Sequence, residues 1–276
     1  MVDGALGPLA SGAFAALVAV GTTVANERWG GRVGGLIGTM PTTIVPASVG
    51  IAATSGTGDN FVVAMCAVPS GMLLSALFLY AWRVIPPRLP AMRFGAQLAL
   101  ATAVTLTLWV AGAVAVVTAM SIVGTDTRTA GIGGALGLLA IIGVGVAACL
   151  SSPPSPKGGR KVPVTVLFAR GGLAGLAIGV SVWIASLGHP LAAGVSSVFP
   201  AIFLTTMIAL WWSQGRAVQA GAVGPMMLGS SAVATYALFA AVTFPRVGLA
   251  AGALLAWLFA VATTTLPAWK WLTRPR

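Results

Sequence analysis

The stretch FVVAMCAVPSGMLLSALFLYAW, residues 61–82, carries no charged side chain and decides the fold class. An α-helix rises about 1.5 Å per residue, so this stretch is long enough to cross a hydrocarbon core of about 30 Å. A single segment inside lipid satisfies its own backbone hydrogen bonds only as a helix. The sequence therefore predicts a transmembrane helix here.

Eight other apolar runs of similar length flank this one, separated by short polar breaks. A transmembrane barrel would instead show segments of roughly ten residues with strict two-residue alternation, which this sequence lacks. We therefore predict an all-α polytopic membrane protein. The nine predicted spans are 5–25, 34–54, 61–82, 94–120, 130–150, 164–187, 191–213, 217–241 and 247–270.

The composition agrees with a membrane protein. Hydrophobic residues make up 58% of the 276 and charged residues only 7%, against about 25% charged in soluble proteins. The formal charge of +11 does not indicate a nucleic-acid partner, because the basic residues lie between apolar runs and not on a soluble face with aromatic neighbours. Lipids are the expected surroundings.

The basic residues also predict the orientation, because Lys and Arg stay on the cytoplasmic side during insertion. With nine spans, only Arg128 and Arg246 fall on one side, and Arg170 lies inside a span. The other side holds Arg28, Arg32, Arg83, Arg88, Arg93, Lys157, Arg160, Lys161, Arg216, Lys270, Arg274 and Arg276. We expect a bacterial cytoplasmic (inner) membrane protein with its N-terminus outside and its C-terminus inside. No basic segment precedes 5–25, so we expect a retained first span.

The chain shows an internal similarity when it is shifted against itself by 159 residues. Gly35 then falls on Gly194, and Pro41 on Pro200, without a gap. Shared membrane composition is the alternative explanation. A true repeat would pair the first span with the sixth, giving halves of opposite orientation, as in many secondary transporters. The predicted units are a first repeat (1–125), a linking span with a Pro-rich loop (126–162) and a second repeat (163–276).

The segment ERWGGRVGGLIGTMPTT, residues 27–43, followed by a Gly-containing loop and another apolar span, resembles small bacterial GlpM-like inner-membrane proteins. The resemblance covers residues 5–120 and, more weakly, 164–270. Members of that family are about half as long as this chain. The resemblance implies a duplicated and fused four-span unit and implies no particular reaction.

Proline and small polar residues within the spans predict a central binding site. Proline removes a backbone donor and frees carbonyl groups that a ligand can satisfy, and paired Gly/Pro-interrupted spans are typical of transporter sites. We therefore expect interruptions in the spans 34–54, 61–82, 191–213 and 217–241. The alternative is that membrane helices use Pro and small residues only for packing. The candidate substrate-binding residues are Thr39, Pro41, Thr42, Thr43, Pro69, Ser70, Gly71, Ser196, Ser197, Pro200, Thr205, Thr206, Gly224 and Pro225, together with Arg170.

Arg170 is the only basic residue well inside a span. A charge in hydrocarbon costs about 3 kcal/mol or more by insertion scales, and such residues often face a cavity or a partner. Arg170 could hold an anionic substrate or pair with Glu27. The alternative is that its side chain extends to the cytoplasmic surface.

No enzyme chemistry is predicted. His189 is the only histidine, and zinc needs three or four ligands, so we expect no metal site and no cofactor. A Ser70 nucleophile would need a base and an oxyanion hole, which the sequence does not place. The Gly34-Gly35 and Gly133-Gly134 pairs lack the strand and lysine of a phosphate loop. We expect no catalytic residues.

The sequence thus favours a secondary transporter that moves a small neutral or anionic solute by alternating access. Two alternatives remain open. One is a channel or lipid scramblase, and the other is a non-catalytic membrane scaffold subunit. The expected partners are membrane lipids and an unidentified small-molecule substrate, and a second copy of the chain is a further candidate.

Overall fold

The computed structural model describes residues 3–29, 40–152 and 164–274, and every regular element in these ranges is helical. The elements are α1 (Asp3–Trp29), α3 (Ile44–Ser55), α4 (Asp59–Val84), η1 (Pro86–Arg88, 3-10), α5 (Phe94–Val123), α6 (Thr127–Leu150), α7 (Val164–Ser186), α8 (Pro190–Ser196), α9 (Ala201–Gln214), α10 (Arg216–Val247), α11 (Leu249–Ala260), η2 (Val261–Thr265, π) and α12 (Leu266–Leu272).

Seven helical stretches in the described ranges are long and apolar enough to cross a membrane. They are Asp59–Arg88, Phe94–Val123, Thr127–Leu150, Val164–Ser186, Pro190–Gln214, Arg216–Val247 and Leu249–Leu272. Each coincides with a predicted span to within a few residues. The prediction of an all-helical chain with many apolar helices is confirmed for the described residues.

The first two predicted spans differ from the other seven. The apolar stretches found there, Gly7–Thr22 and Ile44–Ser55, are shorter. Helix α3 has 12 residues, which gives a length of about 18 Å and falls short of the hydrocarbon thickness. Residues 34–39 of the second predicted span lie outside the described residues. The count of nine spans stays a prediction.

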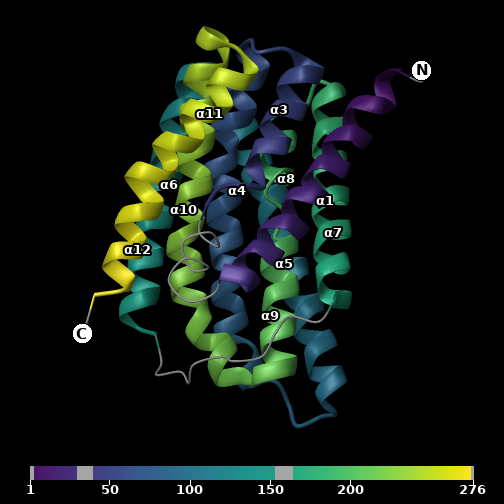
Figure 1. Ribbon diagram of the computed structural model, residues 1–276, viewed down its shortest axis with the longest axis vertical. Coiled ribbons are helices and arrows are strands. Elements are labelled where there is room, and N and C mark those ends of the chain that lie inside the picture. The colour runs from purple at the N-terminus through teal and green to yellow at the C-terminus, as the bar shows by residue number, and fades with distance from the viewer. Residues whose placement is uncertain (1–2, 30–39, 153–163, 275–276) are drawn as a thin grey trace.

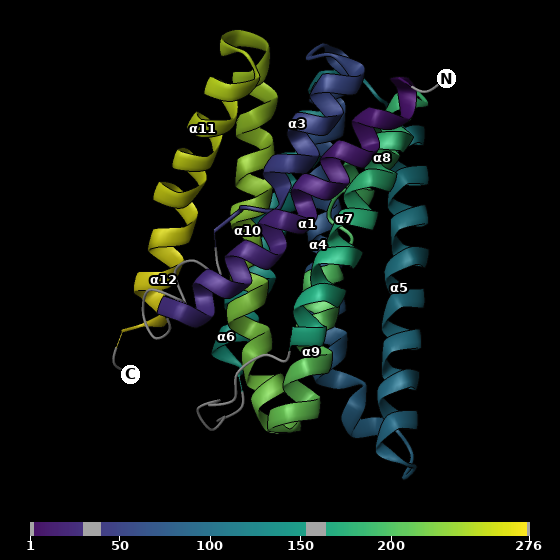
Figure 2. The same cartoon turned by 45° about the vertical axis from the view of Figure 1, so that its right-hand side comes forward.

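Helices α4 and α10 form the centre of the bundle (Figures 1 and 2). They run antiparallel: Phe61 stacks on Phe244 with ring centroids 5.0 Å apart, and Gln219 donates to the carbonyl of Trp82 at 3.0 Å. Helix α6 packs against both of them. Most of α4 and α10 is buried, whereas α5 at the edge buries only a few residues, Trp109 among them, as expected for a lipid-facing helix.

Helix α1 crosses α7 obliquely, and glycine makes the close approach possible (Figure 2). A Cβ atom at Gly12 would lie 2.7 Å from the carbonyl oxygen of Gly175, and a Cβ at Gly175 would lie 2.7 Å from that of Gly12. Farther along, Gly179 meets Pro8. The two helices therefore run antiparallel with their backbones in contact, as membrane helices do where small residues line the crossing.

Helix α4 carries small residues on one face, namely Ala64, Ala67, Gly71 and Ser75, at helical spacing. Helix α8 lies on this face, since a Cβ at its Gly194 would clash with the carbonyl of Ala64. The stripe therefore sets how closely α8 approaches the bundle centre.

The expected interruption of α4 and α10 by proline is wrong. Helix α4 continues through Pro69, and α10 continues through Pro225. Gly137 of α6 packs on the backbone of Pro69 and Ser70. Membrane helices tolerate proline where neighbouring groups and small local adjustments compensate for the lost hydrogen bond.

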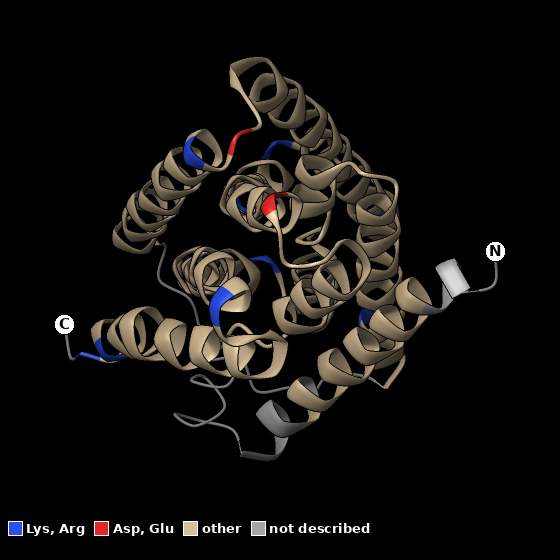
Figure 3. Cartoon of the chain, turned by 90° about the horizontal axis from the view of Figure 1, so that it is seen from above, with Lys and Arg blue, Asp and Glu red and all other residues tan. Residues whose placement is uncertain are grey.

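Basic residues gather at one end of the bundle. Figure 3, a view from above, shows few charged positions among the helices. Arg83 lies in the last turn of α4, Arg88 and Arg93 lie in the α4–α5 connection, and Arg216 begins α10 at the same end. Asp126, at the opposite end, caps α6 by accepting from the backbone N–H groups of Arg128 and Thr129, both at 3.0 Å.

Asp126→Ala is expected to lower the melting temperature in a pH-dependent way. Hydrogen bonds from the side chain and backbone of Thr129 hold the pKa of the Asp126 carboxyl below its ordinary value of 3.8. A lowered folded-state pKa stabilises the fold fully above the unfolded-state pKa, and this contribution disappears as the pH falls through the folded-state pKa. Thermal unfolding in detergent at pH 7 and at successively lower pH should show the two proteins converging. A difference that persists unchanged into strong acid would contradict this role.

Candidate functional site at the break between α8 and α9

The span Pro190–Gln214 is broken near its middle, between the end of α8 and the start of α9. The cause is Pro200, which has no N–H and disfavours helical geometry at Phe199. The chain turns here: the N–H of Phe199 bonds to the carbonyl of Ser196 at 3.0 Å, and α9 restarts with the N–H of Leu204 on the carbonyl of Pro200 at 2.7 Å. The predicted interruption of this span at Pro200 is confirmed.

A buried polar chain from two other helices supports the break. The Ser75 hydroxyl of α4 donates to the carbonyl of Val198 at 2.9 Å, and the indole N–H of Trp109 of α5 donates to the Ser75 hydroxyl at 3.1 Å. Ser75 is fully buried. The Trp109 ring also packs edge-on against Phe199, at 5.2 Å between centroids. A carbonyl freed by the break thus receives a side-chain donor in place of a helical one.

Arg170 lies on the other side of α9, one turn beyond the break. Its guanidinium donates from Nε to the Thr205 hydroxyl at 3.3 Å and from Nη2 to the Thr206 hydroxyl at 2.9 Å. Arg170 is 8% exposed, so the side chain points into the bundle and does not extend to the surface. The predicted alternative of a snorkelling side chain is therefore wrong.

The two threonines connect Arg170 to the backbone next to the break. Thr205 donates to the carbonyl of Ala201 at 2.9 Å, and Thr206 donates to that of Ile202 at 2.7 Å. Each hydroxyl therefore accepts from the guanidinium while donating to the first turn of α9. The result is a cation, two hydroxyls and a non-helical segment grouped within the apolar bundle, a combination that can bind a polar or anionic solute through hydrogen bonds.

The predicted site residues divide into groups. Gly71 lies against Val195 and Val198, and Ser197 is buried with its hydroxyl on the carbonyl of Gly194. The residues that the structure places at the break or on α9 beside Arg170 are Gly71, Ser196, Ser197, Pro200, Thr205 and Thr206.

Other predicted site residues lie elsewhere. Pro69 and Ser70 face α6 through Gly137, and Gly224 packs on the end of α6 at Ala148. Pro225 follows within the same unbroken helix. Their small size serves packing against α6, which is the alternative considered for the prolines. Residues Pro41, Thr42 and Thr43 form the non-helical segment before α3, and Thr39 and the Glu27 side chain lie outside what the structure describes.

Ser75 and Trp109 were not among the predicted site residues. Ser75 lies one helical turn after Gly71 on the small-residue face of α4, so its spacing was a usable signal. What the sequence does not show is that α8 ends opposite this face, because Ser75 and Val198 are 123 positions apart.

Ser75→Ala is expected to destabilise the protein by about 1–3 kcal/mol, because the mutation leaves the carbonyl of Val198 and the N–H of Trp109 buried without this partner. Trp109→Phe removes the donor while keeping most of the ring packing, so its cost should be smaller. The double variant should cost less than the two single losses added together. Thermal or denaturant unfolding in detergent measures the stability of all three variants. If the two single losses of stability add strictly, Ser75 and Trp109 do not act as one hydrogen-bonded unit.

Among the side chains that the structure describes, no group of three or more His, Cys, Asp or Glu residues could hold a metal ion.

The fold and this site define a multi-pass helical membrane protein with a discontinuous helix and a buried arginine in its interior. Comparison with known proteins adds no narrower class: no family model, curated protein or solved structure matches the chain.

Proposed function

We propose that the chain is a secondary transporter that moves a small neutral or anionic solute by alternating access. The observation that carries this proposal is the interior break at Ser197–Pro200 with Arg170, Thr205 and Thr206 beside it. Discontinuous helices supply backbone polar groups at membrane depth, and transporters place their substrate sites at such breaks. A channel or scaffold needs no such buried guanidinium.

Helix packing supports an inverted repeat for this transporter. The 159-residue shift maps Gly12 onto Gly171 and Ala16 onto Gly175. Helices α1 and α7 approach closely at two pairs, Gly12 with Gly175 and Ala16 with Gly171. The shift converts each of these pairs into the other. The shift likewise relates α4 to α10, which run antiparallel at the centre, and α6 packs against both. An axis in the membrane plane near α6 would produce this pattern.

The second span would then mirror the seventh. Pro41 corresponds to Pro200 under the same shift, and residues 40–43 are non-helical before α3, as residues 197–200 are before α9. On this proposal the two breaks face a shared path, with the first repeat supplying Thr42 and Thr43. The resemblance to GlpM-like proteins fits the same duplicated unit.

Arg170 favours an anionic solute over a neutral one. A guanidinium presents several N–H donors in a fixed plane and pairs well with carboxylate or phosphate groups. Its counterpart under the shift is Ser11, so the charge belongs to one repeat only. The basic end of the bundle, with Arg83, Arg88 and Arg93, would be cytoplasmic in a bacterial inner membrane by the positive-inside rule.

The test has two stages. First, purified protein is screened for thermal stabilisation by small carboxylates, phosphates and neutral solutes, since a ligand that binds only the folded state raises the melting temperature. Second, each stabilising solute is offered to proteoliposomes. We expect saturable uptake of at least one anionic solute. Uptake that rises linearly with concentration would indicate a channel, and no solute-dependent flux across the panel would contradict transport.

A further inference from the structure

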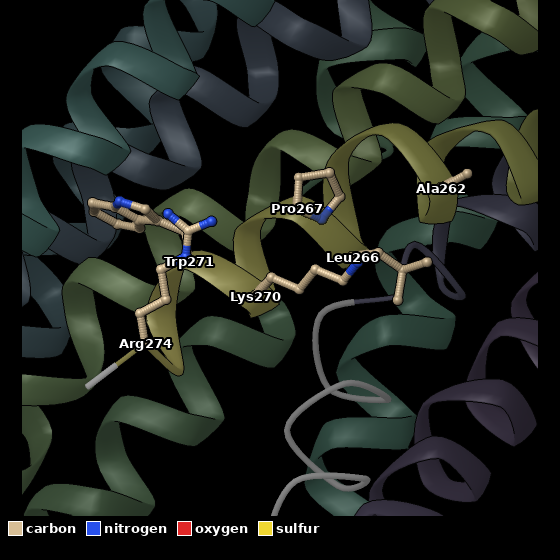
Figure 4. Close-up of a pocket in the computed structure, with 6 residues that line it drawn as sticks. All are labelled: Ala262, Leu266, Pro267, Lys270, Trp271 and Arg274. Carbon is tan, nitrogen blue, oxygen red and sulfur yellow. The ribbon is translucent and has the colours of Figure 1, made fainter.

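The last span contains a groove that the transport proposal does not use. It has a volume of about 330 Å³ and is lined by Ala262, Leu266, Pro267, Lys270, Trp271 and Arg274 (Figure 4). The six residues lie along a single stripe that begins in η2, continues through α12 and ends at Arg274, just after α12. The groove therefore lies on the outer side of one helix and opens toward the surroundings of the bundle.

The π turn shapes this groove. Pro267 has no N–H to donate to the carbonyl four residues earlier, and a one-residue widening of the helix is a common response to such a loss. Within the π turn, the Thr264 hydroxyl bonds to the Thr235 hydroxyl of α10 at 2.9 Å. This bond fixes the inward side of the turn, and Ala262 is left exposed on the outward side.

The residues that line the groove change from charged to apolar along the helix. Lys270 and Arg274 are exposed cations one turn apart, near the end of α12. Ala262 and Leu266 lie one to two turns deeper and are apolar, whereas the indole of Trp271 lies toward the other end of the groove, beside Arg274 (Figure 4). No acidic side chain is among the described lining residues. The groove therefore joins two cations and an indole near the end of the helix to an apolar part deeper in the span, and an anionic phospholipid offers the matching phosphate and acyl chain.

We propose that this groove binds one anionic phospholipid from the surrounding bilayer. Its phosphate would sit between Lys270 and Arg274, and the upper part of an acyl chain would lie along Leu266 and Ala262. Each Lys or Arg near a membrane surface strengthens the binding of an anionic lipid by about fivefold. Trp271 prefers the headgroup zone, which sets the depth of the lipid. A side chain that merely extends to the interface would need no groove beneath it.

The test is native mass spectrometry of the detergent-solubilised full chain, titrated with dioleoyl phosphatidylglycerol or dioleoyl phosphatidylcholine. We expect the first phosphatidylglycerol to bind the wild type at least fivefold more tightly than phosphatidylcholine. Lys270→Gln/Arg274→Gln should remove this preference. The matched control Arg88→Gln/Arg93→Gln removes the same charge from the α4–α5 connection and should keep it.

Ala262→Phe provides a second test that leaves the charge unchanged. The new ring would fill the apolar part of the groove from an exposed position, so the fold should be unaffected while the affinity for phosphatidylglycerol falls several-fold. Three results would each overturn the proposal. They are a preference retained by Lys270→Gln/Arg274→Gln, an equal loss in the control pair, and wild-type binding by Ala262→Phe.

Discussion

Gly194→Ala is expected to destabilise the protein by at least about 3 kcal/mol, because a methyl group at this position would occupy the space of the Ala64 carbonyl. Neither group can yield easily. The carbonyl belongs to the backbone of α4, and the segment just after α8 is held to α4 by the hydrogen bond from Ser75 to the carbonyl of Val198. Helix α8 would have to move away from α4, and the break beside Pro200 would move with it.

Thermal unfolding in detergent measures this effect, with Gly143→Ala as the matched control. Gly143 lies within α6, and a Cβ there would meet nothing within 4 Å. The same chemical change should therefore be neutral or slightly stabilising, since alanine is the better helix former. If Gly194→Ala were as stable as Gly143→Ala, the described approach of α8 to α4 would be wrong.

Arg170→Met is expected to reduce solute uptake at least tenfold. Methionine fills much of the same volume but offers no donor to Thr205, Thr206 or an anionic solute. If Arg170 binds the solute, removing it should lower the rate of uptake measured per folded protein in the vesicles. Arg170→Lys keeps the charge but not the planar fork, and we expect an intermediate rate.

Two further measurements separate function from folding. Arg88→Gln removes an exposed arginine from η1 and should leave uptake unchanged. The melting temperature of Arg170→Met shows whether the variant is folded. Normal uptake by a folded Arg170→Met protein would assign Arg170 a purely structural role and would leave the solute site without its main polar group.

The long spans were predictable because lipid imposes a simple requirement. An uncharged run such as residues 61–82 must form its own backbone hydrogen bonds, so its helical state follows from composition alone. The break at Pro200 was predictable for the same local reason, since the missing N–H belongs to the residue itself. The sequence could not distinguish Pro200 from Pro69 or Pro225, because that difference depends on which neighbouring helix packs against each one.

The candidate site was predictable in its residue types but not in its grouping. Arg170 stood out as a cation inside a span, and Thr205 and Thr206 as polar residues near Pro200. Their hydrogen bonds join positions 35 and 36 residues apart, and no local pattern encodes that approach. The role of Ser75 likewise depends on where α8 ends relative to α4.

Accessibility of the break from the two sides of the membrane tests alternating access most directly. Single cysteines replace Ser196 and Thr206 in a background where Cys66 and Cys149 are alanine. A membrane-impermeant maleimide is then applied to right-side-out and to inside-out vesicles. Leu108→Cys on the exposed face of α5 is the control and should react from neither side, because lipid suppresses thiolate formation. A transporter predicts that Ser196→Cys and Thr206→Cys react from both sides. If both behave like Leu108→Cys, the break is packing inside lipid and not a solute path.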